Sequence, residues 1–224
     1  VHRFLATGTL TPTTPAAATA APTVIGQSFQ GGYYAGMIAA NGSGFPTHYL
    51  VVAPKASGQM SAAWSSVGTN TGFTSVIDGP TNSAGIAALG ASYAAATFCE
   101  GLSIGGYTDW YMPAQNELEV CYYFMKSVSQ NNHSPGTYGS NANAVAPEPI
   151  STKYTATNPP QTPITAFQVG NAEAFNDGTY WSSTDFTDNS QAYYQSFHSG
   201  DPGVQSVYAK STGFVVRAVR RVAI

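Results

Sequence analysis

The sequence predicts an α+β fold, because helical and strand-like patterns occur in separate stretches of the chain. Apolar side chains recur with helical spacing in residues 82–98 and again in residues 114–128. Short runs of β-forming residues, separated by turn residues, occupy residues 24–53 and 180–222. We therefore expect two helices packed around a small antiparallel sheet.

The first strands are expected to form a hairpin. Residues 24–38 and 48–53 are rich in β-formers, and the turn residues Asn41-Gly42-Ser43-Gly44 separate them. Gly31-Gly32 lies inside the first run, which predicts a bulge or a close backbone approach. The next stretch, 82–98, predicts one helix with a stripe of Ile86, Leu89, Tyr93 and Ala96 and a face of small residues.

A second helix is predicted over residues 114–128. Pro113 suits the first helical position, where a missing N–H costs nothing. Glu117 falls in the first turn, where a carboxylate meets the positive end of the helix dipole. One apolar stripe has the spacing i, i+3, i+4 and i+7 and comprises Leu118, Cys121, Tyr122 and Met125.

The second half of the chain begins with a long loop. Residues 129–179 lack periodicity and contain six prolines, and ordered loops of this length tend to be functional. Residues 180–222 then predict short strands, with alternation in 192–197 and 214–219 and a turn at 199–203.

The N-terminal residues 1–23 are expected to form an extended arm. Residues 6–23 carry no charge and consist largely of Thr, Pro and Ala, which favour extended or polyproline-like backbone. Such a segment has too little apolar surface to fold alone, so an ordered arm needs a neighbouring subunit to lie on. We therefore expect two parts, the arm 1–23 and a domain over 24–224.

Composition excludes several classes of function. Charged residues make up 8% of the chain and the net charge is −3, which does not favour binding to nucleic acid or to an anionic membrane. No apolar run approaches the roughly 20 residues of a membrane span. The basic residues Arg217, Arg220 and Arg221 are expected to pair with nearby acids or a neighbouring subunit. Cys99 and Cys121 are expected to be small buried hydrophobes, with a disulfide as the alternative.

Catalytic signatures are weak. Gly101-Leu102-Ser103-Ile104-Gly105 matches the G-x-S-x-G pattern, but a nucleophile elbow must follow a strand and open a helix, whereas this match follows a predicted helix. The four histidines are scattered and have no metal-ligand spacing. We expect no catalytic residues, no metal and no cofactor.

Recognition is better supported. Residues 185–208 combine Tyr, Asn, Gln and His, which offer large contact areas and adaptable hydrogen bonds, as in antibody paratopes. The alternative is a polar hairpin whose alternate aromatic residues fill the core. The candidate ligand-binding residues are Asn189, Tyr193, Tyr194, Gln195, His198, Asp201, Gln205 and Tyr208.

Three sequence blocks carry a family resemblance. They are Gly106-Tyr107-Thr108-Asp109-Trp110 running on to Glu117, then Tyr180-Trp181-Ser182-Ser183, then Val216-Arg217-Ala218-Val219-Arg220. Their order and spacing over residues 24–222 resemble the DUF1566 family, also called the Lcl C-terminal domain. Ala114 stands where that family often has Ser or Thr, so a hydroxyl helix cap is not expected here. Trp110 and Trp181 are predicted to be buried core anchors.

The resemblance implies a C-type-lectin-like domain with a long loop insertion, of the kind found in bacteriophage fibre proteins and bacterial adhesins. The calcium-ligand motifs of sugar-binding C-type lectins have no counterpart at Glu148-Pro149-Ile150 or Trp181-Ser182-Ser183. We expect a non-enzymatic virion protein that recognises a host surface glycan or protein, is homo-oligomeric and contacts other virion subunits through its arm. The alternatives are a purely structural capsid fibre or decoration protein and a bacterial cell-surface adhesin.

Overall fold

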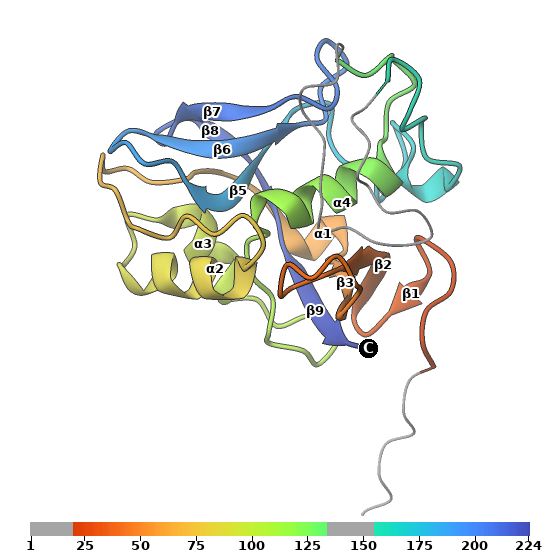
Figure 1. Ribbon diagram of the computed structural model, residues 1–224, viewed down its shortest axis with the longest axis horizontal. Helices are drawn as coiled ribbons and strands as arrows, with labels where there is room; N and C mark the ends of the chain where they lie inside the picture. Colours follow the sequence, from red (N-terminus) through yellow and green to blue (C-terminus); the bar gives the residue numbers. More distant parts are fainter. Residues whose placement is uncertain (1–19, 134–154) are drawn as a thin grey trace, which may run out of the picture.

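The computed structural model describes residues 20–133 and 155–224 and has an α+β architecture (Figure 1). Within these residues, two sheets of four and five strands pack with four α-helices and one 3-10 helix. The α+β class is confirmed. The expectation of two helices around one small antiparallel sheet is wrong, because the chain divides its strands between two sheets that share the last strand-forming block.

The first sheet has the strand order β1-β2-β3-β9, and every neighbouring pair is antiparallel. The predicted hairpin is confirmed, since Tyr33 pairs with Val52 and Ile38 pairs with His48. The sheet joins the two ends of the described chain, and its strands are β1 (Ser28–Phe29), β2 (Gly32–Ile38), β3 (His48–Val52) and β9 (Val219–Ala223).

The two glycines at the start of β2 allow a close backbone approach, as predicted. A Cβ on Gly32 would lie 2.3 Å from the carbonyl oxygen of Val52, and one on Gly31 would lie 2.9 Å from the carbonyl oxygen of Ile104. The same holds from the opposite side, where a Cβ on Gly105 would lie 2.5 Å from the Cα of Gly31. The turn before β2 therefore packs backbone to backbone on the Gly105-Gly106 turn.

The second sheet has the strand order β4-β8-β5-β6-β7. One pair, β5 with β8, is parallel and meets at Tyr180 and Val215, so the expectation of a wholly antiparallel sheet fails here. Residues 199–203 form the turn between β6 and β7, as predicted. The strands are β4 (Gln59–Ala63), β5 (Thr179–Asp185), β6 (Gln191–Ser196), β7 (Gln205–Ala209) and β8 (Gly213–Arg217).

Ala218 is the point where the chain passes from the second sheet to the first. Its N–H donates to the carbonyl of Gly58 and its carbonyl accepts from the N–H of Ala53, both at 2.9 Å. The Val215–Arg220 block is therefore held at its centre by the backbone and sends one strand into each sheet.

Helix α4 (Gln115–Met125) lies between the two sheets and contacts β2, β5 and β6 (Figure 1). Its predicted stripe is confirmed, because all four side chains are buried: Leu118, Cys121, Tyr122 and Met125. The helix begins at Gln115 with Ala114 as its cap residue, so Pro113 lies outside it. Glu117 supplies the other half of a capping box, because its Oε2 accepts from the N–H of the cap residue Ala114 at 2.8 Å.

The single helix predicted over residues 82–98 is wrong, because the structure has two helices there, α2 (Gly79–Ala88) and α3 (Ala94–Glu100). Asp78 Oδ1 accepts from the N–H of Thr81 at 3.4 Å, so α2 begins earlier than its apolar pattern. Gly90 has φ +108° just after the helix, a conformation that side chains other than glycine disfavour. A further short helix, α1 (Lys55–Gly58), precedes β4.

Both predicted core anchors are buried. Trp110 and Trp181 are 0% exposed and belong to the same cluster, together with residues of α2 and α3. A second cluster gathers around α4 and includes Tyr180 and Phe197. Cys99 lies in the first cluster and Cys121 in the second, and both are free thiols, so the disulfide alternative is excluded.

The long loop packs back onto the core where the structure describes it. After residue 155 it contains the 3-10 helix η1 (Thr165–Phe167), and both Phe167 and Phe175 are buried in the cluster around α4. Residues 134–154 of the predicted insertion lie outside the described part of the chain. Residues 1–19 of the predicted arm also lie outside it.

Candidate recognition surface

The arginines of the last block pair with carboxylates, as predicted. Arg220 donates from Nε and Nη2 to the two carboxylate oxygens of Asp109, each at 2.8 Å, and stacks 4.0 Å over the ring of Tyr107. Its Nη1 donates to both the backbone carbonyl and the side-chain oxygen of Gln30, a residue at φ +43°. The first and last family blocks therefore meet directly and fix the turn before β2.

Two more arginines bind carboxylates, one of them fully buried. Arg217 is fully buried and donates to Glu173 Oε2 at 2.7 Å and to the Ala53 carbonyl at 2.9 Å. Arg221 Nε donates to Glu117 Oε1 at 2.7 Å, and the Tyr111 hydroxyl donates to the same oxygen. Burial raises the pKa of the Glu117 carboxyl, while Arg221 opposes that rise. These side chains hold strands and helix together and are not open to a ligand.

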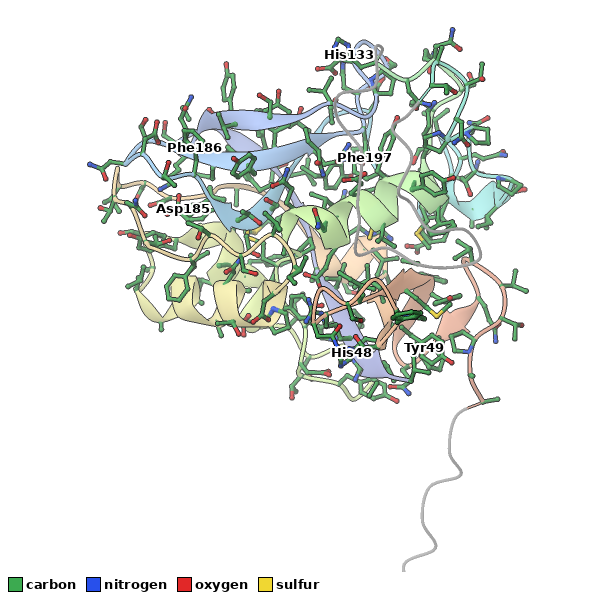
Figure 2. All side chains as sticks on the ribbon, in the orientation of Figure 1. His48, Tyr49, His133, Asp185, Phe186 and Phe197 are labelled. Carbon is green, nitrogen blue, oxygen red and sulfur yellow. The ribbon has the colours of Figure 1, made fainter. Side chains whose placement is uncertain are left out.

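The lysines near β7 and α4 are also occupied. Lys210 is 2% exposed, and its Nζ lies 2.6 Å from Asp185 Oδ1, 2.7 Å from the Thr69 carbonyl and 4.7 Å over the ring of Trp64. Lys126 donates to the carbonyl of Gln130 at 2.6 Å. Asp185 lies at the end of β5, beside Phe186 (Figure 2). The surface formed by β6, β7 and β8 therefore gains no free cation from these lysines.

The eight predicted ligand-binding residues do not form one site. Gln195 on β6 and its partner Gln205 on β7 are 1% and 7% exposed, because α4 packs on this face of the sheet. Gln205 Oε1 accepts from Gln115 Nε2 at 3.1 Å. Their burial argues against the predicted role in ligand binding, since a buried side chain cannot reach a ligand outside the domain.

His198 and Asp201 lie at the turn between β6 and β7. His198 Nδ1 is 3.4 Å from Asp201 Oδ1, and Asp177 binds the neighbouring residue Ser199 through both its N–H and its hydroxyl. Asn189 precedes the opposite end of β6, whose six residues span about 20 Å at ~3.3 Å each. The two ends of the predicted set are therefore too far apart to contact one small ligand together.

Tyr193 lies on the same face of β6 as Gln195, which is opposite to the face that carries Tyr194. Its ring packs edge-on against Phe186 at 5.6 Å, and both side chains are half-buried. Phe197 follows β6 at the other end of the strand, over α4 (Figure 2), where it contacts Tyr122 at 5.2 Å.

An aromatic platform forms from side chains of β6, β7 and β8, which pack together although β5 lies between β8 and β6 in the sheet. It consists of Tyr194, Tyr208 and Phe214, whose ring centroids are 5.2–6.4 Å apart. Buried Trp181 supports it from below, 4.6 Å from Phe214. Tyr208 is 50% exposed, and Tyr194 and Phe214 are half-buried. Two of the three were predicted, whereas Phe214 was considered only as part of a strand.

A small hollow is lined by residues 65–68, Ser190 and residues 209–211, and its volume is about 160 Å³. Four serines contribute to its lining, and the hydroxyl groups of three of them already donate within the chain: Ser65 to the Val67 carbonyl, Ser66 to the Ser92 carbonyl and Ser190 to Asp188. A second hollow of about 320 Å³ lies along the turn before β2, between residues 28–33 and Pro54.

Within residues 20–133 and 155–224, the structure provides no group of three His, Cys, Asp or Glu side chains that could hold a metal ion. Ser103 follows α3 and enters the Gly105-Gly106 turn, with an isolated bridge between Ile104 and Tyr107. This loop has neither the preceding strand nor the following helix of a nucleophile elbow, as predicted. None of the helices that the structure describes is long and apolar enough to cross a membrane.

The arrangement can therefore offer a ligand exposed aromatic rings, neutral hydroxyl groups and backbone groups. No curated protein matches the sequence significantly. The model of the Lcl C-terminal domain matches residues 59–220, which contain β4 to β8, all of α2 to α4 and the start of β9. The match begins later than the resemblance over 24–222, so β1 to β3 precede it. The chain belongs to the Lcl C-terminal domain family, also known as DUF1566.

Proposed function

We propose that this chain is a bacteriophage virion protein, a fibre or receptor-binding module that recognises a glycan or protein on the host surface. The observation that carries the proposal is the aromatic platform of Tyr194, Tyr208 and Phe214. Tyr208 leaves half of its surface exposed although the rest of the cluster packs closely. Exposed aromatic clusters on a rigid sheet offer large contact area at low entropic cost, which is how recognition surfaces gain affinity.

The rest of the domain supports recognition without catalysis. Trp181 and the paired arginines are committed to the core, so the sequence blocks typical of the family serve as scaffold. We infer that the fold is C-type-lectin-like, with the platform on strands that follow the long loop, and that recognition requires no metal or cofactor. The low charge of the chain agrees with a surface that neutral polar groups keep in solution.

We further propose that residues 1–23 form an arm that contacts other virion subunits and makes the protein a homo-oligomer. The support is their composition, which has too little apolar surface for independent folding. Arms repeated around an assembly would add their weak contacts through effective concentration. Immunogold electron microscopy of particles would locate the protein, and a location on a capsid rather than a fibre would favour a structural role.

A cell-binding assay tests the recognition function. The fluorescently labelled full chain is added to a panel of intact bacterial cells, which are untreated, oxidised with periodate or treated with protease. Loss after periodate indicates a glycan receptor and loss after protease a protein receptor. Tyr208→Ala should lower binding at least about tenfold, because exposed aromatic anchors dominate such interfaces.

The matched control is Phe45→Ala. Phe45 is also an exposed aromatic residue, 75% exposed, but it lies in the turn between β2 and β3. This variant should bind cells like the unchanged protein. The proposal fails if the chain binds no cells of the panel, or if Phe45→Ala and Tyr208→Ala reduce binding equally.

A further inference from the structure

We propose that the aromatic platform binds a neutral glycan, with a pyranose ring stacked on Tyr208 and Phe214. This inference rests on the proposed recognition function and names the class of its ligand. It follows from the geometry of the rings and from the charges around them.

The rings present a suitable surface. Tyr208 and Phe214 are inclined at 39° with centroids 5.2 Å apart, while Tyr194 stands edge-on to both. Two inclined rings with a third beside them form a shallow apolar cradle rather than a closed pocket. The C–H groups on one face of a pyranose ring can pack on such a surface, where the negative faces of the aromatic rings favour the weakly positive C–H groups.

The charged residues that the structure describes near the platform do not favour an anionic ligand. The nearest lysine in sequence, Lys210, is 2% exposed and already bound to Asp185 and to the Thr69 carbonyl. Arg217 lies on the same strand as Phe214 but is 0% exposed and paired with Glu173. Sulfate, phosphate and carboxylate groups are recognised by unpaired Arg or Lys side chains, and the residues that the structure describes at this surface provide none.

A polysaccharide array tests the inference with the full chain. The probes are the neutral polymers dextran, mannan, galactan and chitin oligomers, and the anionic polymers dextran sulfate, polysialic acid and teichoic acid. We expect binding to at least one neutral polymer and weaker binding to dextran sulfate than to dextran. Binding should change less than about twofold between about 50 mM and about 500 mM salt, because no ion pair is formed.

Variants locate the site. Tyr208→Ala and Phe214→Ala should each lower neutral-polymer binding at least about tenfold, whereas Tyr208→Phe, which keeps the ring, should stay within about threefold. Phe45→Ala should bind normally. Circular dichroism and the thermal midpoint of each variant show whether it is folded, and Tyr208→Phe remains informative if an alanine variant is not.

The outcomes separate the two proposals. Preference for dextran sulfate or teichoic acid, with a steep salt dependence, overturns the neutral-glycan inference. If Tyr208→Ala abolishes that anionic binding, the platform is still the recognition surface. Binding to none of the neutral polymers also overturns the inference. Binding to a neutral polymer that Tyr208→Ala and Phe214→Ala leave unchanged overturns both the inference and the platform as the recognition surface.

Discussion

Replacement of Arg217 by methionine should destabilise the domain strongly. The guanidinium is 0% exposed and donates to the Glu173 carboxylate, the Glu173 backbone carbonyl and the Ala53 carbonyl, at 2.7–2.9 Å. Methionine fills a similar volume but leaves these acceptors without their donor, and the Glu173 side chain is only 13% exposed. Breaking a buried ion pair from one side costs about 3–5 kcal/mol, which lowers the unfolding midpoint of a chain this long by roughly 6–20 °C.

Arg220→Met is the matched comparison. Arg220 also binds a carboxylate with two hydrogen bonds, but the Asp109 side chain is 54% exposed and can be hydrated once the arginine is gone. The expected loss is therefore smaller, about 1–3 kcal/mol, most of it from the hydrogen bonds to Gln30. Thermal unfolding followed by circular dichroism measures both. If Arg220→Met proves the more destabilising variant, or Arg217→Met leaves the midpoint unchanged, burial does not set the strength of these pairs.

Three other changes have expected outcomes. Trp181→Ala should cost about 3–5 kcal/mol in urea unfolding, because the ring is 0% exposed, and an unchanged midpoint would exclude its role as a core anchor. Burial lowers the pKa of Lys126 from 10.5 to about 8, so the folded protein loses this proton before the unfolded chain does. The buried amine is therefore less destabilising when it is neutral. The resulting gain in folding stability is fully present above about pH 10.5 and is lost as pH falls through about 8. The unfolding midpoint should therefore rise relative to that of Lys126→Met between pH 7 and pH 10, and a falling difference would contradict the sign. Deletion of residues 1–19 should leave the unfolding midpoint unchanged, because the hydrogen bond from Thr23 to Gln27 remains. The same deletion should abolish incorporation into particles, and normal incorporation would refute the proposed role of the arm in assembly.

Local patterns predicted much of the fold because they reflect local physics. The stripe from Leu118 to Met125 is buried as expected, since residues three and four apart share one helix face. The hairpin of β2 and β3 and the burial of Trp110 also follow from turn residues and side-chain size. The break at Gly90 was not predicted, because small residues on both sides of it continue a helical pattern. In the structure, α2 ends just before Gly90, which has φ +108°.

Features that depend on distant contacts could not be predicted in the same way. Alternation along β6 gives two faces but not which face α4 covers, so Gln195 was expected at the surface and is buried. Phe214 joins the platform because β8 runs parallel to β5, a pairing that requires a crossover and leaves no mark in the local sequence. The pairing of Arg220 with Asp109 likewise joins residues that are 111 positions apart in the chain.

The most direct test of the recognition surface is hydroxyl-radical footprinting of the full chain, free and bound to the cells that it recognises. Oxidation of the exposed aromatic side chains is measured by mass spectrometry after recovery from the cells. Recognition through the platform predicts that Tyr208 and Phe214 become protected on binding, while Phe45, on the turn between β2 and β3, is oxidised as in the free protein. Protection of Phe45 with unchanged oxidation of Tyr208 would contradict the account and place the recognition surface elsewhere on the domain.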